Sequence, residues 1–328
     1  DKGLKAIGED AKIVEKDDDR ELVVLVVGET ARADRFSLNG YARETNPLLA
    51  KEKVASFTNA WACGTSTAVS VPCMFSIYDT DDYSKAKAAR TENVLDVLQR
   101  AGVNVLWLDN NSDSKGVAKR VPYQSYKSSP MNPDCDNECR DVGMLKNLQS
   151  YIDQHPNGDI FIVLHQMGNH GPAYYKRYPA DFERFTPTCQ TNELAECERA
   201  TIDNAYDNAI LYTDHFLAEV IGLLKKNNDQ FEAAMLYVSD HGESLGENNL
   251  YLHGLPNMLA PDEQKHVPMI FWFSDSFLHD GISVDLLQPR LDEHFSHDNL
   301  FHTLLGLFEV ETGVYDQNKD MLKQGQGD

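Results

Sequence analysis

Short, uninterrupted runs of apolar residues constrain the fold of this chain more than any other feature. Residues 22–27 are six consecutive apolar residues, four of them valines, and the run ends at Gly28. A run without polar alternation is typical of a strand that is buried on both faces. Similar runs occur at residues 103–108, 160–164, 233–238 and 268–273. A proline opens the last run, and proline is tolerated at the first position of a strand.

Segments with helical periodicity lie between these runs. Residues 93–100 place four apolar side chains on one side, and residues 201–225 repeat apolar residues at spacings of three, four or seven. Alternation of buried strands with amphipathic helices predicts an α/β fold, an α/β/α sandwich around a mainly parallel central sheet. We expect residues 21–328 to form this domain, and the polar residues 1–20 to be a linker or a surface helix.

The charge of the chain excludes one class of partner. Lys and Arg total 30 against 52 Asp and Glu, which gives a formal charge of −22 with histidine neutral. Non-specific binding of nucleic acid depends on clustered Lys and Arg, so we expect no nucleic-acid partner. A small phosphate-bearing substrate is compatible with this charge, because a bound metal can invert the local field.

The hydropathy indicates a water-soluble part of a protein. No apolar run approaches the ~20 residues that span a bilayer, and no signal peptide opens the chain. The chain starts at Asp1 without an initiator methionine. We therefore expect an excised or processed soluble part, and we expect it to be monomeric.

The cysteines fall into three close pairs: Cys63 with Cys73, Cys135 with Cys139, and Cys189 with Cys197. Local pairs that each close a short loop are the simplest arrangement of disulfides. A zinc cluster is the alternative, but the chain has no C-x-x-C motif and the spacings do not suit a zinc ribbon. We expect three disulfides and an oxidising compartment.

Metal-type ligands follow one of the predicted strands directly. The run at residues 233–238 continues into Ser239-Asp240-His241-Gly242-Glu243. Carboxylate oxygen and imidazole nitrogen are ordinary zinc ligands, and ligands gather at the carboxyl ends of parallel strands. Adjacent strand residues point to opposite faces, so Asp240 and His241 can share a metal only if the chain bends, which Gly242 permits.

The first predicted strand offers a third ligand. Glu29 follows Gly28 at the same edge of the predicted sheet. Glu29 also suits the start of a following helix, where the helix dipole stabilises a carboxylate. The residue alone leaves both interpretations open.

Several hydroxyl side chains lie inside the loop that the first cysteine pair would close: Thr65, Ser66, Thr67 and Ser70. Ser and Thr favour helix N-caps, so a capped short helix explains them. The same geometry would present a hydroxyl nucleophile near a metal, at a helix end that favours a phosphate. Periodicity does not choose among the four.

Two loop-rich stretches, 109–140 and 166–200, follow predicted strands and should cover the same edge. Asn111 and Lys115 are suitable donors to phosphoryl oxygens, although a polar turn explains them equally well. His165 and His170 lie beside Gly and Pro at this edge. We expect the other lone histidines to be structural: His155, His215, His266, His279, His294, His297 and His302. Polar loops from four strands thus converge, as they do in active sites.

Five sequence blocks carry a resemblance to a known family: Gly28-Glu29-Thr30-Ala31-Arg32, Cys63-Gly64-Thr65-Ser66-Thr67, Asn110-Asn111-Ser112-Asp113-Ser114-Lys115, His165-Gln166-Met167-Gly168-Asn169-His170-Gly171-Pro172 and Ser239-Asp240-His241-Gly242-Glu243-Ser244-Leu245-Gly246-Glu247. The chain resembles the catalytic domain of lipid A phosphoethanolamine transferases, especially the mobilised colistin-resistance (MCR) type. These enzymes belong to the alkaline phosphatase and sulfatase superfamily.

The resemblance implies roles for individual residues. The position matching Thr67 is the nucleophile, and those matching Glu29, Asp240 and His241 hold a catalytic zinc ion together with it. The positions that surround the phosphate match Asn111, Lys115, His165, His170 and His253, and the last two can contact a second zinc ion. The short Cys135–Cys139 loop departs from some relatives, which affects the lipid-facing rim.

The resemblance also implies a reaction. Phosphoethanolamine would pass from phosphatidylethanolamine to a lipid A phosphate through a phosphothreonine intermediate, which implies resistance to polymyxins such as colistin. Family members have an N-terminal membrane domain in the bacterial inner membrane and this domain in the periplasm. One alternative is a hydrolytic phosphatase, phosphodiesterase or sulfatase, although Cys73-Met74-Phe75-Ser76 lacks the sulfatase pattern C-x-P-x-R. Another is a zinc-stabilised envelope binding domain without activity.

Overall fold

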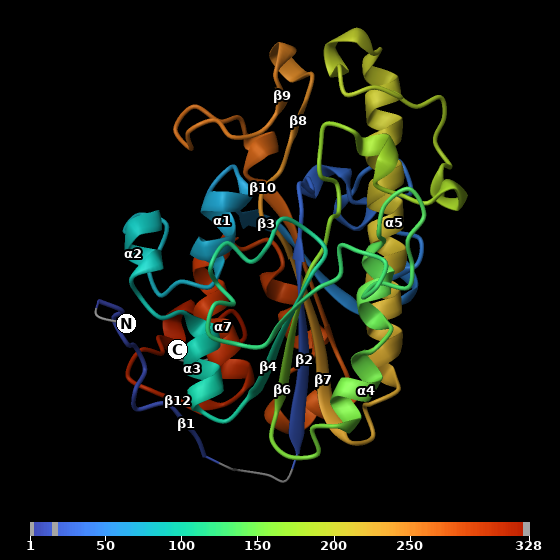
Figure 1. The fold of residues 1–328 in the computed structure, drawn as a ribbon. Coiled ribbons are helices and arrows are strands. Elements are labelled where there is room, and N and C mark those ends of the chain that lie inside the picture. Colours follow the sequence, from blue (N-terminus) through green and yellow to red (C-terminus); the bar gives the residue numbers. More distant parts are fainter. Residues whose placement is uncertain (1–2, 15–18, 324–328) are drawn as a thin grey trace.

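A computed structural model of the protein describes residues 3–14 and 19–323. Its centre is an eight-stranded sheet in the order β11-β3-β10-β7-β2-β6-β4-β5, with helices on both faces (Figure 1). All neighbouring pairs in this sheet are parallel except those of β10, which runs antiparallel to β3 and β7. The prediction of an α/β/α sandwich with a mainly parallel sheet is therefore confirmed.

The elements have the following bounds. The strands are β1 (Lys12–Ile13), β2 (Arg20–Gly28), β3 (Val54–Trp61), β4 (Asn104–Asp109), β5 (Tyr123–Ser125), β6 (Ile160–His165), β7 (Phe231–Ser239), β8 (Ser244–Leu245), β9 (Tyr251–Leu252), β10 (His266–Phe273), β11 (Phe295–Ser296) and β12 (Val310–Glu311). The α-helices are α1 (Thr67–Met74), α2 (Lys85–Ala89), α3 (Val94–Arg100), α4 (Leu148–Asp153), α5 (Arg199–Lys225), α6 (Val284–Leu287) and α7 (Leu300–Leu307). Each of the five apolar runs is thus a strand.

The apolar run of β2 is buried on both faces, as predicted. Val23 and Leu25 belong to a hydrophobic cluster that contains residues of α3 and α7. Leu22 and Val24 belong to the cluster on the other face, which contains residues of α4 and α5. Side chains of this kind stabilise the fold by about 1.5–3 kcal/mol each when fully buried, so the centre of the sheet is a rigid platform for the strand ends.

The disulfide prediction is confirmed in full: Cys63–Cys73, Cys135–Cys139 and Cys189–Cys197. The first bridge encloses the start of α1, the second lies between β5 and α4, and the third lies between β6 and α5. The bridges therefore hold loops at one edge of the sheet.

In the described part of residues 1–20, the chain packs against the domain. β1 pairs antiparallel with β12, and Ile7 is buried and donates its backbone N–H to Glu92 Oε1. This described part contains the short strand β1 and no helix. A membrane domain preceding the chain stays a prediction.

Candidate active site and metal centre

The two strands at the middle of the sheet bring the predicted metal ligands together. β2 and β7 are parallel neighbours, with Gly28 opposite Ser239. Glu29 therefore leaves the sheet beside Asp240 and His241, and all three side chains are buried. The carboxyl ends of two adjacent strands thus supply one cluster of ligands.

Glycine is required at position 242 for lack of space and not for a special backbone conformation. Its φ is not left-handed; instead, a Cβ at this position would lie 2.0 Å from the carbonyl oxygen of Glu263. The close approach continues in a hydrogen bond from Gly242 N to Gln264 O at 2.9 Å. Glycine is needed because two backbone segments meet at this point.

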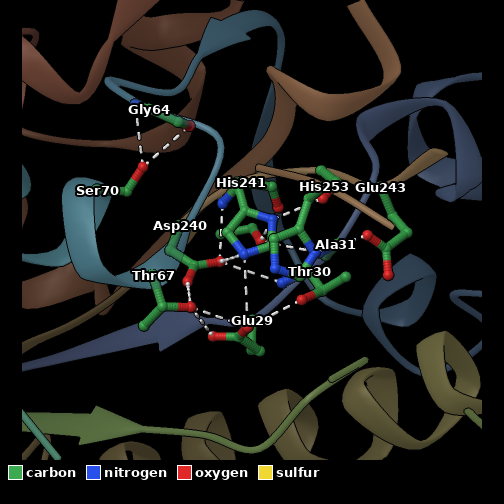
Figure 2. Close-up of polar contacts among 12 residues, drawn as sticks. Glu29, Thr30, Ala31, Gly64, Thr67, Ser70, Asp240, His241, Glu243 and His253 are labelled. Atoms are coloured by element: carbon green, nitrogen blue, oxygen red, sulfur yellow. Dashed lines mark hydrogen bonds and ion pairs between the residues drawn. The ribbon is translucent and has the colours of Figure 1, made fainter. Parts of the chain in front are cut away.

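The ligand atoms face one another across a short distance (Figure 2). His241 Nε2 lies 3.5 Å from Glu29 Oε1 and 3.6 Å from Asp240 Oδ1. One ligand atom from each of the three residues lies within 4.8 Å of the others. Thr67 Oγ1 donates to Asp240 Oδ2 at 2.6 Å and also lies 2.9 and 3.0 Å from the Glu29 oxygens. Four oxygen and nitrogen donors therefore converge on one point.

The arrangement of His241 fits a bound cation. Its Nδ1 lies 2.6 Å from the carbonyl oxygen of Gly242, which places a proton on Nδ1 and leaves Nε2 as the ring nitrogen directed at the carboxylates. Nε2 is buried and has no hydrogen-bond partner among residues 3–14 and 19–323. Two carboxylates, an imidazole and a hydroxyl oxygen match the donor preference of zinc.

The electrostatics of the cluster also favour a cation. Burial and the charge of Glu29 raise the pKa of Asp240 to about 7. Burial alone would lower the pKa of His241, but the two carboxylates raise it to about 10. The pKa of Glu29 is well below its usual value despite its burial, because of the nearby charge of His241. Two buried carboxylates thus attract positive charge at this point.

The geometry distinguishes among the four hydroxyl candidates. Thr67 is the first residue of α1 and reaches the carboxylates. Ser70 Oγ instead bonds to the backbone N–H and carbonyl of Gly64, both at 3.0 Å, and Thr65 Oγ1 donates to Leu255 O. Ser66 is the N-cap residue but forms no side-chain cap. Thr67 is therefore the hydroxyl in position to act as a nucleophile.

Asn111 and His165 lie directly beside the cluster. Asn111 Nδ2 donates to Glu29 Oε2 at 3.0 Å and to Gln166 O at 2.8 Å. His165, at the end of β6, bonds through Nδ1 to Asp109 Oδ2 at 2.8 Å, and both side chains are fully buried. Burial lowers and Asp109 raises the pKa of His165, with a net rise. Both residues can thus orient groups around a substrate.

Lys115 lies apart from the ligand cluster. Its Nζ donates to Ser112 O at 2.8 Å, and its side chain lines a separate cavity beside α1. Its backbone is left-handed, with φ +55°, a conformation that only a constrained loop maintains for a lysine. Lys115 therefore belongs to the wall of that cavity and does not contact the candidate metal ligands.

The last two predicted histidines lie at the outer side of the cluster. The ring of His253 lies 4.1 Å from the ring of His241, and its Nδ1 bonds to Glu243 Oε1 at 2.8 Å. His170 is half-buried, and burial is the main cause of its lowered pKa. His170 and His253 are thus the site histidines that remain partly accessible.

Sequence reasoning missed several supporting residues. Glu243 holds His253 and also accepts a hydrogen bond from Tyr174 at 2.5 Å. His297, expected to be merely structural, is buried and bonds to Cys63 N and Ser239 O, both at 2.9 Å. It thereby ties the nucleophile loop to the metal loop. Glu243 could have been identified from sequence, because it is a charged residue two positions after His241. No local signal distinguishes His297.

Comparisons with known proteins agree with this geometry. A match to the family described as Sulfatase covers residues 21–310. The chain belongs to the sulfatase family. The family match includes every predicted ligand and the proposed nucleophile, so the candidate metal centre lies within the shared domain.

Phosphoethanolamine transferases are among the proteins to which this chain is similar. Phosphoethanolamine transferase EptA of Escherichia coli K12 is 48% identical over 326 residues, which cover 98% of this chain and 59% of that protein. Phosphatidylethanolamine transferase Mcr-1 of Escherichia coli is 52% identical over 297 residues, covering 88% of this chain and 54% of that protein. The resemblance to this family is confirmed, and the chain spans less than two thirds of the length of these relatives.

A solved structure extends the similarity to three dimensions. The soluble domain of lipooligosaccharide phosphoethanolamine transferase A from Neisseria meningitidis matches with a TM-score of 0.93 at 44% identity, covering 98% of this chain and 97% of that domain. Among the described residues, no helix has both the length and the hydropathy that crossing a bilayer requires. The chain corresponds in extent to that soluble domain.

Proposed function

We propose that this chain is the catalytic part of an enzyme that transfers phosphoethanolamine from phosphatidylethanolamine to a phosphate of lipid A. The observation that carries the proposal is the position of Thr67 Oγ1, 2.6 Å from Asp240 Oδ2 and beside Glu29. Membership among the phosphoethanolamine transferases supports the choice of transferred group.

The proposed cofactor is one catalytic zinc ion, with a second ion as a further possibility at His170 and His253. Glu29, Asp240 and His241, with Thr67, would hold the catalytic ion, and the free Nε2 of His241 supports this assignment. Bound there, zinc would polarise the phosphoryl oxygens and lower the pKa of a coordinated hydroxyl. Glu29 and Asp240 then orient the Thr67 hydroxyl.

In the proposed first step, Thr67 Oγ1 forms a bond to phosphorus while the bond to the diacylglycerol oxygen breaks. The Thr67 proton ends on the departing diacylglycerol, and phosphoethanolamine stays on Thr67. In the second step, an oxygen of the lipid A phosphate attacks phosphorus, and the Thr67 oxygen leaves and regains a proton. His253, with Nδ1 held by Glu243, has Nε2 as its remaining ring nitrogen, which would take part in these transfers when no second ion is bound there.

Polar side chains around the cluster would stabilise the charge on the transferring group. Asn111 is already oriented by Glu29 and by Gln166 O, and His165 is fixed by Asp109. Donors that are held in place before the reaction need no reorganisation during it. We assign Asn111, Lys115 and His165 to contacts with substrate phosphate oxygens.

The proposed setting is the periplasmic face of the bacterial inner membrane. Three disulfides support an oxidising compartment, and a similar protein from Neisseria meningitidis is an integral membrane protein. We propose that the full-length protein has a membrane domain that brings this domain to its lipids. Modified lipid A would be less anionic, which would reduce binding of cationic polymyxins such as colistin.

Intact-mass measurement tests the nucleophile. The chain is incubated with zinc and a phosphatidylethanolamine analogue, and a phosphoethanolamine adduct is expected on wild-type protein. Thr67→Ala should form no adduct, whereas Thr67→Ser, which keeps the hydroxyl, should still form one. An undiminished adduct on Thr67→Ala would remove Thr67 as the nucleophile.

A second measurement separates transfer from hydrolysis. Lipid A is supplied to the adduct-bearing protein, and the products are identified by mass spectrometry. Modified lipid A is expected as the main product. Release of free phosphoethanolamine with unmodified lipid A would instead support a hydrolase of the same family.

A further inference from the structure

A cavity of about 280 Å³ lies beside the nucleophile helix. Its wall is formed by α1, by α2 with the residues before it, by the start of α3, and by residues 115–120. Figure 1 shows α1, α2 and α3 on the same side of the sheet. Ligand sites of about 300 Å³ are at the small end of the known range, so this cavity is large enough for a phosphate-bearing part of a headgroup.

The wall of this cavity is positively charged, in a chain whose formal charge is −22. Lys85, Lys115 and Lys119 line it. Lys85 and Lys119 have no hydrogen-bond or ion-pair partner in the described part of the chain, and Lys115 donates only to the carbonyl of Ser112. The three ammonium groups therefore keep their charge uncompensated by a carboxylate.

The remaining charged residues of the wall are already neutralised. Arg120 forms a two-bond ion pair with Asp96 at 2.8 Å, and Glu92 forms one with Arg100 at 2.8 and 2.9 Å. The net excess of positive charge thus comes from the three lysines. An anionic ligand would complement it.

A buried hydroxyl group also lies next to this cavity. Tyr83 lines the cavity, and its hydroxyl oxygen is buried without a hydrogen-bond partner among the described residues. A buried hydroxyl without a partner destabilises the protein by about 1–3 kcal/mol. Burial raises the pKa of Tyr83 to about 12, so the group stays a neutral donor.

The cavity and the metal centre share two structural elements. Ala68 and Pro72, one turn apart on α1, line the cavity, and Ala68 directly follows Thr67. The loop that carries Asn111 beside Glu29 continues to Lys115 in the cavity wall. The cavity thus lies against the helix that begins with Thr67 and against the loop that carries Asn111.

We propose that this cavity binds the phosphate of the lipid A headgroup that is not being modified. The proposal rests on the proposed function, because it assigns a second contact for the same acceptor. Lys85 and Lys119 would donate to this phosphate, while the acceptor phosphate reacts at Thr67. Charge-assisted hydrogen bonds to phosphate are the strong class of such contacts.

Binding of water-soluble headgroups tests the proposal without turnover. The zinc-loaded chain with Thr67→Ala is titrated with deacylated lipid A headgroup that carries either two phosphates or one, by calorimetry. The form with two phosphates should bind about 10-fold more tightly. Adding Lys85→Gln and Lys119→Gln should abolish that difference and leave the affinity for the form with one phosphate unchanged.

A matched control removes the same charge elsewhere. Lys127 and Lys226 are exposed and do not line the cavity, so Lys127→Gln with Lys226→Gln should preserve the 10-fold difference. A difference that persists in the Lys85/Lys119 variant overturns the proposal, as does equal binding of the two headgroups. Inorganic phosphate that binds as tightly as the headgroup with two phosphates also overturns it.

The adduct reaction separates this proposal from the proposed function. With Thr67 intact, Lys85→Gln with Lys119→Gln should form the phosphoethanolamine adduct at the wild-type rate, because the donor step does not use the cavity. Normal adduct formation without a headgroup preference contradicts the cavity assignment alone. A wild-type chain that forms no adduct contradicts the proposed function, whichever headgroup binds.

Discussion

The strand pair β2 and β7 buries carboxylates at both of its ends, and the two groups have different neighbours. At the carboxyl end, Glu29 and Asp240 face the free Nε2 of His241. At the amino end, Glu21 lies opposite Glu232 in the strand register and donates its backbone N–H to Asp159 Oδ1 at 2.9 Å. The same two strands thus place buried acids in contrasting environments.

The contrast appears in the pKa values. At the amino end, burial and the nearby Asp159 raise the pKa of Glu21 to about 11, so this carboxyl holds a proton at neutral pH. At the carboxyl end, Glu29 stays ionised against His241. Closeness of carboxylates alone does not distinguish the ends, because Glu21, Asp280 and Glu309 also come within 4.8 Å of one another. The amino end also has an imidazole, since His279 comes within 4.8 Å of Asp19 and Glu232, but there the histidine and the aspartate are exposed. Full burial of all three ligands and the Thr67 hydroxyl make the difference.

The largest expected effect is at the carboxyl end. Asp240→Asn removes a ligand charge and the acceptor for Thr67, so zinc should be lost and transfer should fall by at least about 10³-fold. Metal content by mass spectrometry and the transfer rate check this. Glu21→Gln is the matched control, an acid-to-amide change on the same strand pair, and it should keep both zinc and activity. Equal zinc loss in the two variants would break the comparison.

A smaller effect is expected one step away from the ligands. Asp109 Oδ2 accepts from His165 Nδ1 at 2.8 Å, and its Oδ1 accepts from Asn111 N at 2.8 Å. Asp109→Asn should lower transfer by about 10–100-fold while zinc is retained, since supporting residues of this kind orient groups and do not hold the metal.

The pH profile identifies the cause of that loss. Asp109 raises the pKa of His165. In Asp109→Asn, the part of the pH–rate profile that reports the titration of His165 should therefore shift to lower pH. An unshifted limb would show that Asp109 acts only through packing.

Much of the sheet could be predicted from sequence, because burial on both faces leaves an uninterrupted apolar run. β3 was missed because it mixes polar residues such as Ser56, Thr58 and Asn59 into its eight positions. The direction of β10 could not be predicted either. An apolar run looks the same in a parallel and an antiparallel strand, and only the connection to β7 determines it.

The candidate site was predictable as far as each residue carried its own local signal. Glu29, Asp240 and His241 each follow an apolar run directly, so their convergence follows from the sheet. Thr67 could not be chosen from periodicity, because the choice depends on contacts with residues 38 and 173 positions away. The hydrogen bond between Tyr174 and Glu243 joins residues 69 positions apart, and no local pattern records it.

The smallest expected effect concerns stability at the amino end. The folded-state pKa of Glu21 is raised above its usual value, so the folded protein binds a proton that the unfolded chain releases between about pH 4.5 and 11. The resulting stability is fully present below that range and is lost as the pH rises through it. Glu21→Gln keeps a neutral side chain at every pH and should therefore be the more stable protein at neutral pH.

The pH dependence of unfolding provides the decisive measurement. Between about pH 6 and 9, the free energy of unfolding of wild-type protein should fall more steeply than that of Glu21→Gln, by at most about 1.4 kcal/mol per pH unit. Urea titrations at several pH values measure both slopes. If the slopes are parallel, no proton is held by Glu21, and the acids at the amino end must be neutralised by positive charge, as at the carboxyl end. The amino and carboxyl ends of β2 and β7 would then differ in which residues surround the carboxylates, and not in whether the carboxylates are charged.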